Sequence, residues 1–212
     1  MSIAENVAAI RAAMESAARD AGRDPKEIKL CAATKMNDAA AVRQAIAAGV
    51  DVCGENRVQE LTQKLGENAY VGAPVHFIGH LQTNKVRQVV GKVDLIQSVG
   101  SLHLLEVNIG EEAAKTGFAA SEILPLIDKI DSFSNICVRG LMAIPPISEN
   151  PGDNSKFFLK MREIYVDIRA KKKDNVQVDC LSMGMSGDYL DAIRCGSTMV
   201  RIGTAIFGER HY

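Results

Sequence analysis

The chain has 212 residues, a length that suits one large domain and is short for two. Its 25 basic residues nearly balance 26 acidic ones, which argues against a nucleic-acid-binding protein because phosphate contacts need a basic excess. No stretch approaches the roughly 18 apolar residues of a membrane span, and no leader pattern opens the sequence. We therefore expect a single domain over residues 1–212, without a membrane span or secretory signal.

The five cysteines are odd in number, widely spaced and never arranged as a CxxC pair. This pattern favours buried, reduced thiols in a cytoplasmic protein over a disulfide framework or a zinc site. His76 and His80 have the spacing of a helical zinc motif, but they fall on a predicted strand, where the two side chains would be about 13 Å apart. We predict no metal site.

The first predicted element is a helix. Ser2 and Glu5 fit a capping box, and the helix is expected to end near Gly22, before Asp24-Pro25. Its apolar stripe consists of Ile3, Val7, Ile10 and Met14.

Strands and helices then alternate along the chain. The predicted strands are 28–34, 50–54, 75–79, 93–99, 104–109, 137–144, 176–183 and 199–207. The predicted helices are 38–49, 58–65, one capped by Thr83, one capped by Ser121, 157–173 and 188–195. Eight strands separated mostly by helices predict an α/β fold, a single (β/α)8 TIM-type barrel with an extra N-terminal helix.

One interval is too short for this pattern. Only ten residues separate the predicted strand ends Ser98 and Asn108, whereas a parallel crossover needs about a dozen or more. Either the fourth crossover helix is shortened or missing, or a stretch is absent from the sequence.

The carboxyl ends of the strands carry the active site in barrels of this type. Lys35 follows the first strand, where partial burial would favour the neutral, nucleophilic amine. Most lysines are simply solvated, so this position alone is a weak signal.

The segments after strands seven and eight are rich in glycine and hydroxyl groups. Ser186, Gly203 and Thr204 could form a phosphate cradle, or the glycines could simply make turns. Arg201 lies within an apolar strand, where a charge without a partner is costly. A lysine, a phosphate cradle and an arginine facing a ring nitrogen together suit pyridoxal 5′-phosphate (PLP).

Several motifs extend this hypothesis. The sequence resembles the pyridoxal phosphate homeostasis protein (YggS/PROSC) family, a barrel similar to the alanine racemase N-terminal domain. The similar stretches are AATK at 32–35, GENRVQEL at 54–61, HFIGHLQTNKV at 76–86, VNIGEEAAKTGF at 107–118, GLMAIPP at 140–146, LSMGMSGDYLDAI at 181–193 and GSTMVRIGTAIFG at 196–208.

The resemblance implies a cytoplasmic, monomeric PLP carrier for vitamin B6 homeostasis, and indirectly amino-acid homeostasis, rather than an enzyme. The expected partners are PLP and PLP-requiring apo-enzymes. The resemblance implies that Lys35 is the Schiff-base lysine and that Arg201 meets the pyridine nitrogen. It further places Ser186, Gly203 and Thr204 at the phosphate and Asn56 at the pocket wall.

Two departures and two alternatives accompany this interpretation. The family usually has a helix in the fourth crossover, and Leu190 stands where its pattern usually has Glu. A weak PLP-dependent racemase or lyase, or a phosphate-binding barrel without PLP, would use the same scaffold.

Glu55 is expected at the surface or pocket rim. The loop 145–155 is expected to be an ordinary exposed loop or a lid.

Overall fold

The computed structural model describes residues 1–97, 105–107, 109–110, 117–147 and 150–208. Its strands are β1 (Lys29–Ala33), β2 (Val52–Glu55), β3 (Val75–Phe77), β4 (Leu95–Ile96), β5 (Leu105–Val107), β6 (Val138–Ala143), β7 (Val176–Ser182) and β8 (Met199–Ile202). Its α-helices are α1 (Ile3–Asp20), α2 (Ala39–Ala47), α3 (Val58–Gly66), α4 (Val86–Val89), α5 (Ala120–Asp128), α6 (Ser155–Ala170), α7 (Tyr189–Arg194) and α8 (Thr204–Phe207).

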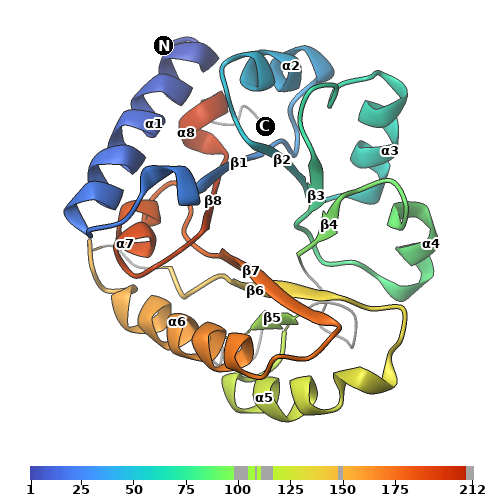
Figure 1. Ribbon diagram of the computed structural model, residues 1–212. Coiled ribbons are helices and arrows are strands. Elements are labelled where there is room, and N and C mark those ends of the chain that lie inside the picture. The colour runs from blue at the N-terminus through green and yellow to red at the C-terminus, as the bar shows by residue number, and fades with distance from the viewer. Residues whose placement is uncertain (98–104, 108, 111–116, 148–149, 209–212) are drawn as a thin grey trace.

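The strands form one parallel sheet in the order β4-β3-β2-β1-β8-β7-β6-β5. The first and last strands are therefore neighbours, and Figure 1 shows the sheet curled inside a ring of helices. This arrangement confirms the predicted α/β, TIM-type barrel. The expectation of a short fourth crossover concerns the connection from β4 to β5, most of which (98–104) lies outside the described residues. No helix in the described part of the chain is long and apolar enough to cross a membrane.

Alternate residues along each strand face the lumen and the helices. On β1, Leu30 and Ala32 belong to a large apolar cluster with α1 and α2, whereas Cys31 packs in a separate small cluster with Val52 and Met199. This alternation is the two-residue period of a strand. Side chains in register with Cys31 and Met199 therefore point into the barrel.

Helix α1 begins as predicted: the Ser2 hydroxyl accepts from Glu5 N, and Ser2 N donates to the Glu5 carboxylate. The helix packs between α7 and α2 in the outer ring and also contacts α8 (Figure 1). Asn6 Nδ2 donates to Ile206 O at 2.9 Å, and Arg23 Nη1, just beyond the helix, donates to Ile193 O at 2.7 Å. The extra helix thus covers the junction of β8 and β1.

Three local predictions were wrong. The strand predicted over 199–207 ends at Ile202, and the apolar run after Gly203 forms the single-turn helix α8. Helix α5 follows Ala119, whose amide donates to Glu122, so Ser121 is not the cap. Thr83, which was expected to cap a helix, lies inside a short 3₁₀ turn (Thr83–Lys85) that precedes α4, so it is not the cap.

Candidate cofactor site

The lumen-facing register brings the predicted site residues to one end of the barrel. Ala33 pairs with Gly54 on β2, so Lys35 lies beside Asn56 just beyond the two strand ends. On the other side Ala32 pairs with Ile202, and a methyl group added at Gly203 would lie 3.5 Å from Ala33 O. Lys35 and Asn56 are both half-buried, so their side chains can be reached from this end.

Arg201 lies deeper in the lumen, with only 5% of its surface exposed. Its Nη1 donates to Ser182 Oγ at 2.7 Å and its Nη2 donates to Ala143 O at 3.0 Å. The position agrees with its lumen-facing register beside Cys31. These contacts fix the plane of the guanidinium group.

The hydrogen bonds continue from Arg201 across the lumen. Ser182 Oγ donates to Gln97 Oε1 at 2.6 Å, and Gln97 Nε2 lies 2.7 Å from His76 Nδ1. Burial lowers the pKa of His76 to about 4, so its ring is neutral at pH 7 and Nδ1 accepts from Gln97. We call His76, Gln97, Ser182 and Arg201 the inner polar chain.

The loops after β7 and β8 carry the predicted phosphate-binding residues. Ser186 is half-buried in the first loop, where Met185 N donates to Asp188 Oδ1 at 2.7 Å. Arg201 N donates to Gly184 O at 3.0 Å and joins β8 to the loop after β7. Thr204 is exposed at the start of α8, directly after Gly203. The structure therefore places these hydroxyl and backbone groups near the Lys35 end of the barrel.

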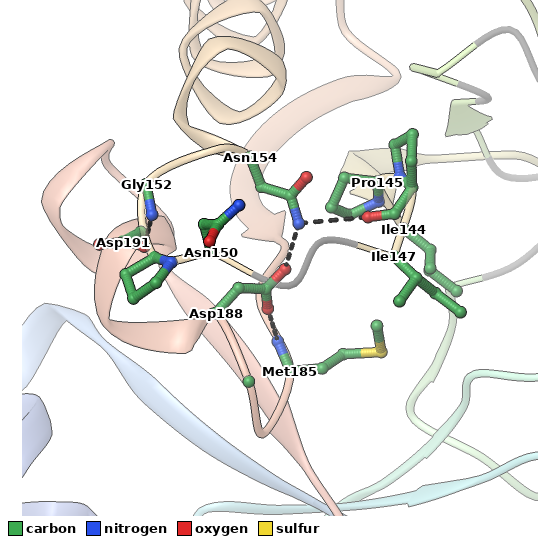
Figure 2. Close-up of a pocket in the computed structure, with 12 residues that line it drawn as sticks. Ile144, Pro145, Ile147, Asn150, Gly152, Asn154, Met185, Asp188 and Asp191 are labelled. Atoms are coloured by element: carbon green, nitrogen blue, oxygen red, sulfur yellow. Dashed lines mark hydrogen bonds between the residues drawn. The ribbon is translucent and has the colours of Figure 1, made fainter.

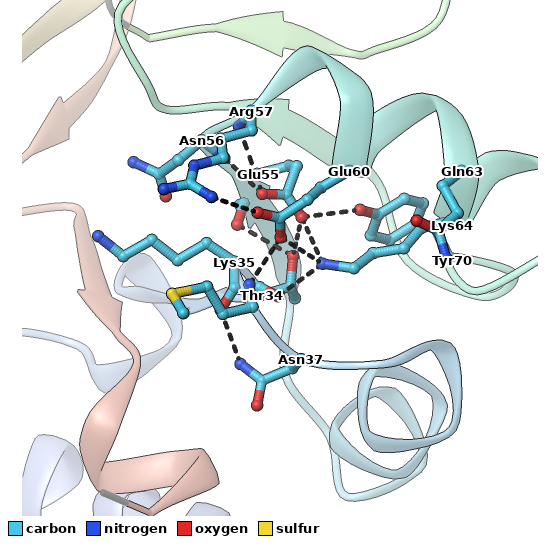
Figure 3. Close-up of polar contacts among 12 residues, drawn as sticks. Thr34, Lys35, Asn37, Glu55, Asn56, Arg57, Glu60, Gln63, Lys64 and Tyr70 are labelled. Atoms are coloured by element: carbon cyan, nitrogen blue, oxygen red, sulfur yellow. Dashed lines mark hydrogen bonds and ion pairs between the residues drawn. The ribbon is translucent and has the colours of Figure 1, made fainter. Parts of the chain in front are cut away.

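A second polar group lies behind the sheet, under α3 (Figure 3). Lys64 Nζ donates to Glu55 Oε2 at 2.6 Å and to Thr34 O at 2.7 Å, and Tyr70 OH donates to Glu55 Oε2 at 3.3 Å. Glu55 Oε1 also accepts from Asn56 N at 2.7 Å. We call Thr34, Glu55, Lys64 and Tyr70 the outer polar cluster.

The outer polar cluster corrects the expectation for Glu55. This carboxylate is fully buried, and it lies neither at the surface nor at a pocket rim. On β2, Val52 and Gly54 face the lumen, so the two-residue strand period places Glu55 on the side that faces the helices. This alternation is the signal in the sequence that indicated the orientation of Glu55. Lys64, Gln97 and Ser182 could not be identified from the sequence, because long-range partners decide their roles.

A cavity of about 460 Å³ lies between the loops after β6 and β7 (Figure 2). Asn154 Nδ2 donates to Asp188 Oδ2 at 2.9 Å, and Gly152 N donates to Asp191 Oδ2 at 2.8 Å. These contacts hold the loop after β6 against the start of α7. Residues 148–149 of the loop that was expected to be exposed or a lid lie outside the described residues.

One polar atom near Lys35 offers a test of cofactor fit. Within the described part of the chain, Asn56 Oδ1 is buried and has no hydrogen-bond partner. A buried acceptor of this kind is costly unless it binds a ligand or water. Together with a nearby lysine amine and a buried guanidinium, it gives a donor and acceptor set that fits a polar aldehyde bearing a hydroxyl and a phosphate.

A parallel barrel with lysine and arginine at the carboxyl ends of adjacent strands defines a class of protein, the barrel of the alanine racemase type. The family model "Alanine racemase, N-terminal domain" matches residues 3–211. Alanine racemase of Corynebacterium glutamicum has the same fold, with a TM-score of 0.63 at 15% identity; the match covers 96% of this chain and 62% of that one.

Much more similar sequences narrow the class. "Pyridoxal phosphate homeostasis protein" of Haemophilus influenzae is 37% identical, covering 100% of this chain and 98% of the relative. The protein of the same name from Pseudomonas aeruginosa is 39% identical, covering 99% and 96%. PipY of Synechococcus elongatus, solved with PLP bound, has a TM-score of 0.79 at 28% identity, covering 97% and 100%. The chain belongs to the pyridoxal phosphate homeostasis protein family.

The chain is shorter than the Haemophilus protein, which it matches over its full length. The alignment with the Haemophilus protein runs over 232 positions, so about 20 of them have no counterpart among the 212 residues here. Leu190, the other departure from the family pattern, is partly buried against the large apolar cluster around α1 and α2. Its side chain therefore contributes to packing behind the sheet.

Proposed function

We propose that this protein binds PLP as a Schiff base on Lys35 and takes part in vitamin B6 homeostasis without catalytic turnover. The observation that carries the proposal is the convergence of Lys35, Asn56 and Arg201 at the carboxyl end of the barrel. The names of the full-length relatives and the PLP bound to PipY support it. We also propose that the protein acts as a cytoplasmic monomer that serves PLP-requiring apo-enzymes. In this way it would act indirectly in amino-acid homeostasis.

Each residue has a separate task in this proposal. PLP supplies an aldehyde that the Lys35 amine can hold covalently. Asn56 Oδ1, buried and without a partner among the described residues, accepts a hydrogen bond from the bound molecule. Arg201 presents a fixed guanidinium toward the ring nitrogen, and a guanidinium keeps that nitrogen unprotonated. Ser186, Gly203 and Thr204 donate to the phosphate.

The alternative, a weak PLP-dependent racemase or lyase, needs a second acid–base group opposite Lys35. Two tyrosine hydroxyls of the described chain bind elsewhere: Tyr70 OH donates to Glu55, and Tyr165 OH donates to Val178 O at 3.3 Å. These contacts favour the carrier. A phosphate-binding barrel without PLP is the third candidate.

Borohydride reduction followed by peptide mass mapping tests the proposal directly. The wild-type protein incubated with PLP is expected to carry a phosphopyridoxyl group on Lys35. Lys35→Ala should lose it and change the free energy of unfolding by less than about 1 kcal/mol, because the side chain is half-buried beyond the strand. Lys29→Ala, at the exposed opposite end of β1, is the matched control and should retain the adduct.

An adduct that is absent from wild type, or present on another lysine, would overturn the Schiff-base assignment. Incubation with L-amino acids and chiral analysis of the products separates the alternatives. D-amino acid formation that disappears in Lys35→Ala would establish an enzyme and contradict a carrier without turnover.

A further inference from the structure

The peptide groups on both sides of Lys35 are held by helix α3. Lys64 Nζ donates to Thr34 O at 2.7 Å, and Met36 N donates to Glu60 Oε2 at 2.6 Å. Lys64 and Glu60 lie one helical turn apart and form an ion pair at 3.3 Å. One cation and one carboxylate of the same helix therefore hold the residues immediately before and after Lys35.

Met36 has an unusual backbone conformation. Its φ is +62°, in the left-handed region that side chains other than glycine rarely adopt. Its side chain is 50% exposed, so packing contributes little to holding this conformation. Strained residues persist where surrounding contacts over-determine them, and here the hydrogen bond to Glu60 supplies such a contact.

The conformation of Met36 matters because it sets the direction in which the chain leaves Lys35. Figure 3 shows the Lys35 side chain extending away from the outer polar cluster, while Lys64 and Tyr70 approach from the opposite side. Asn37 Nδ2 additionally donates to Lys35 O at 3.0 Å. A change in φ at Met36 would rotate the preceding peptide group and alter the direction of the Lys35 side chain.

We propose that Glu60 is a positioning residue: it holds Met36 in the left-handed conformation and thereby aims the Lys35 amine into the lumen. The inference rests on the proposed role of Lys35 in holding PLP. It assigns a function to a partly exposed carboxylate of α3 that lies on the helix side of β1 and β2. Glu60 acts through the backbone and makes no chemical step of its own.

Three variants test the proposal. Glu60→Ala removes the acceptor for Met36 N and is expected to slow the reaction of Lys35 with PLP about tenfold, because small displacements of a reacting group have large kinetic effects. Glu60→Gln keeps an amide oxygen as acceptor and should remain within about twofold of wild type. Glu163→Ala, which breaks an exposed ion pair with Lys160 on α6, is the control and should have no effect.

A glycine at position 36 separates geometry from charge. Glycine adopts a φ near +62° without the steric penalty, so Glu60→Ala should cost only about twofold to threefold in a Met36→Gly background. If instead Glu60→Ala has the same effect in both backgrounds, or Glu60→Gln behaves like Glu60→Ala, Glu60 acts through its charge and the proposal is wrong. Unchanged kinetics in Glu60→Ala would also overturn it.

The second readout does not need PLP. In the apo protein, the rate at which an amine-specific acylating reagent modifies Lys35, followed by peptide mapping, should change in Glu60→Ala and recover in Glu60→Gln. The visible circular dichroism per bound PLP reports the orientation of the cofactor and should follow the same order. A wild-type protein that forms no PLP adduct would contradict the proposed function, whereas the apo measurement would still decide whether Glu60 positions Lys35.

Discussion

The outer polar cluster and the inner polar chain lie on opposite faces of the same sheet and are built differently. The outer cluster contains a buried ion pair, Lys64 with Glu55, whose side chains are 6% and 0% exposed. The inner chain joins Arg201 to His76 through two neutral side chains. Both satisfy buried polar groups. Within the described part of the chain, the outer cluster places two opposite charges in direct contact, and Arg201 donates to a hydroxyl and a carbonyl oxygen.

This difference indicates two ways of supporting one site. The outer cluster holds backbone: Thr34 O binds Lys64, and Asn56 N binds Glu55, so the peptide groups beside Lys35 are fixed from behind. The inner chain holds a side chain, because Ser182 orients Arg201 in the lumen. Disturbing the outer cluster should therefore affect folding most, while disturbing the inner chain should show itself in the pH dependence of stability.

The largest expected effect is that of Lys64→Met. Removing the ammonium leaves the Glu55 carboxylate buried without its cation, and a broken buried pair costs about 3–5 kcal/mol. Chemical denaturation at pH 7 measures the loss. The double variant Glu55→Gln/Lys64→Met removes both charges and should recover a large part of it; a loss equal to that of the single variant would mean that charge is not the cause.

The second effect concerns the inner chain. Burial lowers the pKa of His76 from 6.5 to about 4, so the unfolded chain takes up a proton at higher pH than the folded protein does. The contribution of the neutral His76 ring to the free energy of unfolding is complete above pH 6.5 and is lost as the pH falls toward 4. At pH 5 the loss is about 2 kcal/mol.

Denaturation of wild type and His76→Asn at pH 7 and pH 5 isolates this contribution. The Asn Oδ1 can replace Nδ1 as acceptor for Gln97 but does not titrate. The decrease in the free energy of unfolding between pH 7 and pH 5 should be about 2 kcal/mol smaller in His76→Asn than in wild type. Equal losses would show that the ring does not resist protonation in the folded protein.

The smallest expected effect concerns Tyr70 and Tyr165, whose hydroxyl groups make hydrogen bonds of equal length. Tyr70 OH donates to the Glu55 carboxylate and Tyr165 OH donates to the neutral carbonyl of Val178, both at 3.3 Å. Because bonds to charged groups are worth more, Tyr70→Phe should cost about 1.5 kcal/mol and Tyr165→Phe about 0.5–1 kcal/mol. The reverse order in denaturant titrations would contradict the view that charge distinguishes the outer cluster.

Much of the fold could be predicted from the sequence because strand and helix periods are local signals. The eight strand positions and the capping box at Ser2 are of this kind. The run after Gly203 was misassigned because TAIF is apolar enough for a strand, whereas its single helical turn is fixed by distant contacts such as Asn6 with Ile206. Local pattern alone does not contain that information.

The candidate site divides in the same way. Arg201 could be singled out because a charge within an apolar strand is unusual, whereas Lys35 was a weak signal until the AATK motif at 32–35 was compared with the family; the role of both with PLP remains a prediction. The burial of Glu55 could not be predicted, because it depends on Lys64 from the following helix. The strained φ of Met36 left no mark in the sequence, since methionine is not a residue that normally occupies the left-handed region.

The position of α1 has a consequence for how the chain is made. This helix is synthesised before every strand of the barrel, yet it packs on α7 and α8, which follow β7 and β8. Its buried face, including Val7, Ile10 and Met14, therefore lacks part of its cover until the chain has grown to about residue 207. During synthesis, this apolar helical surface therefore stays incompletely covered until nearly the whole barrel has been made.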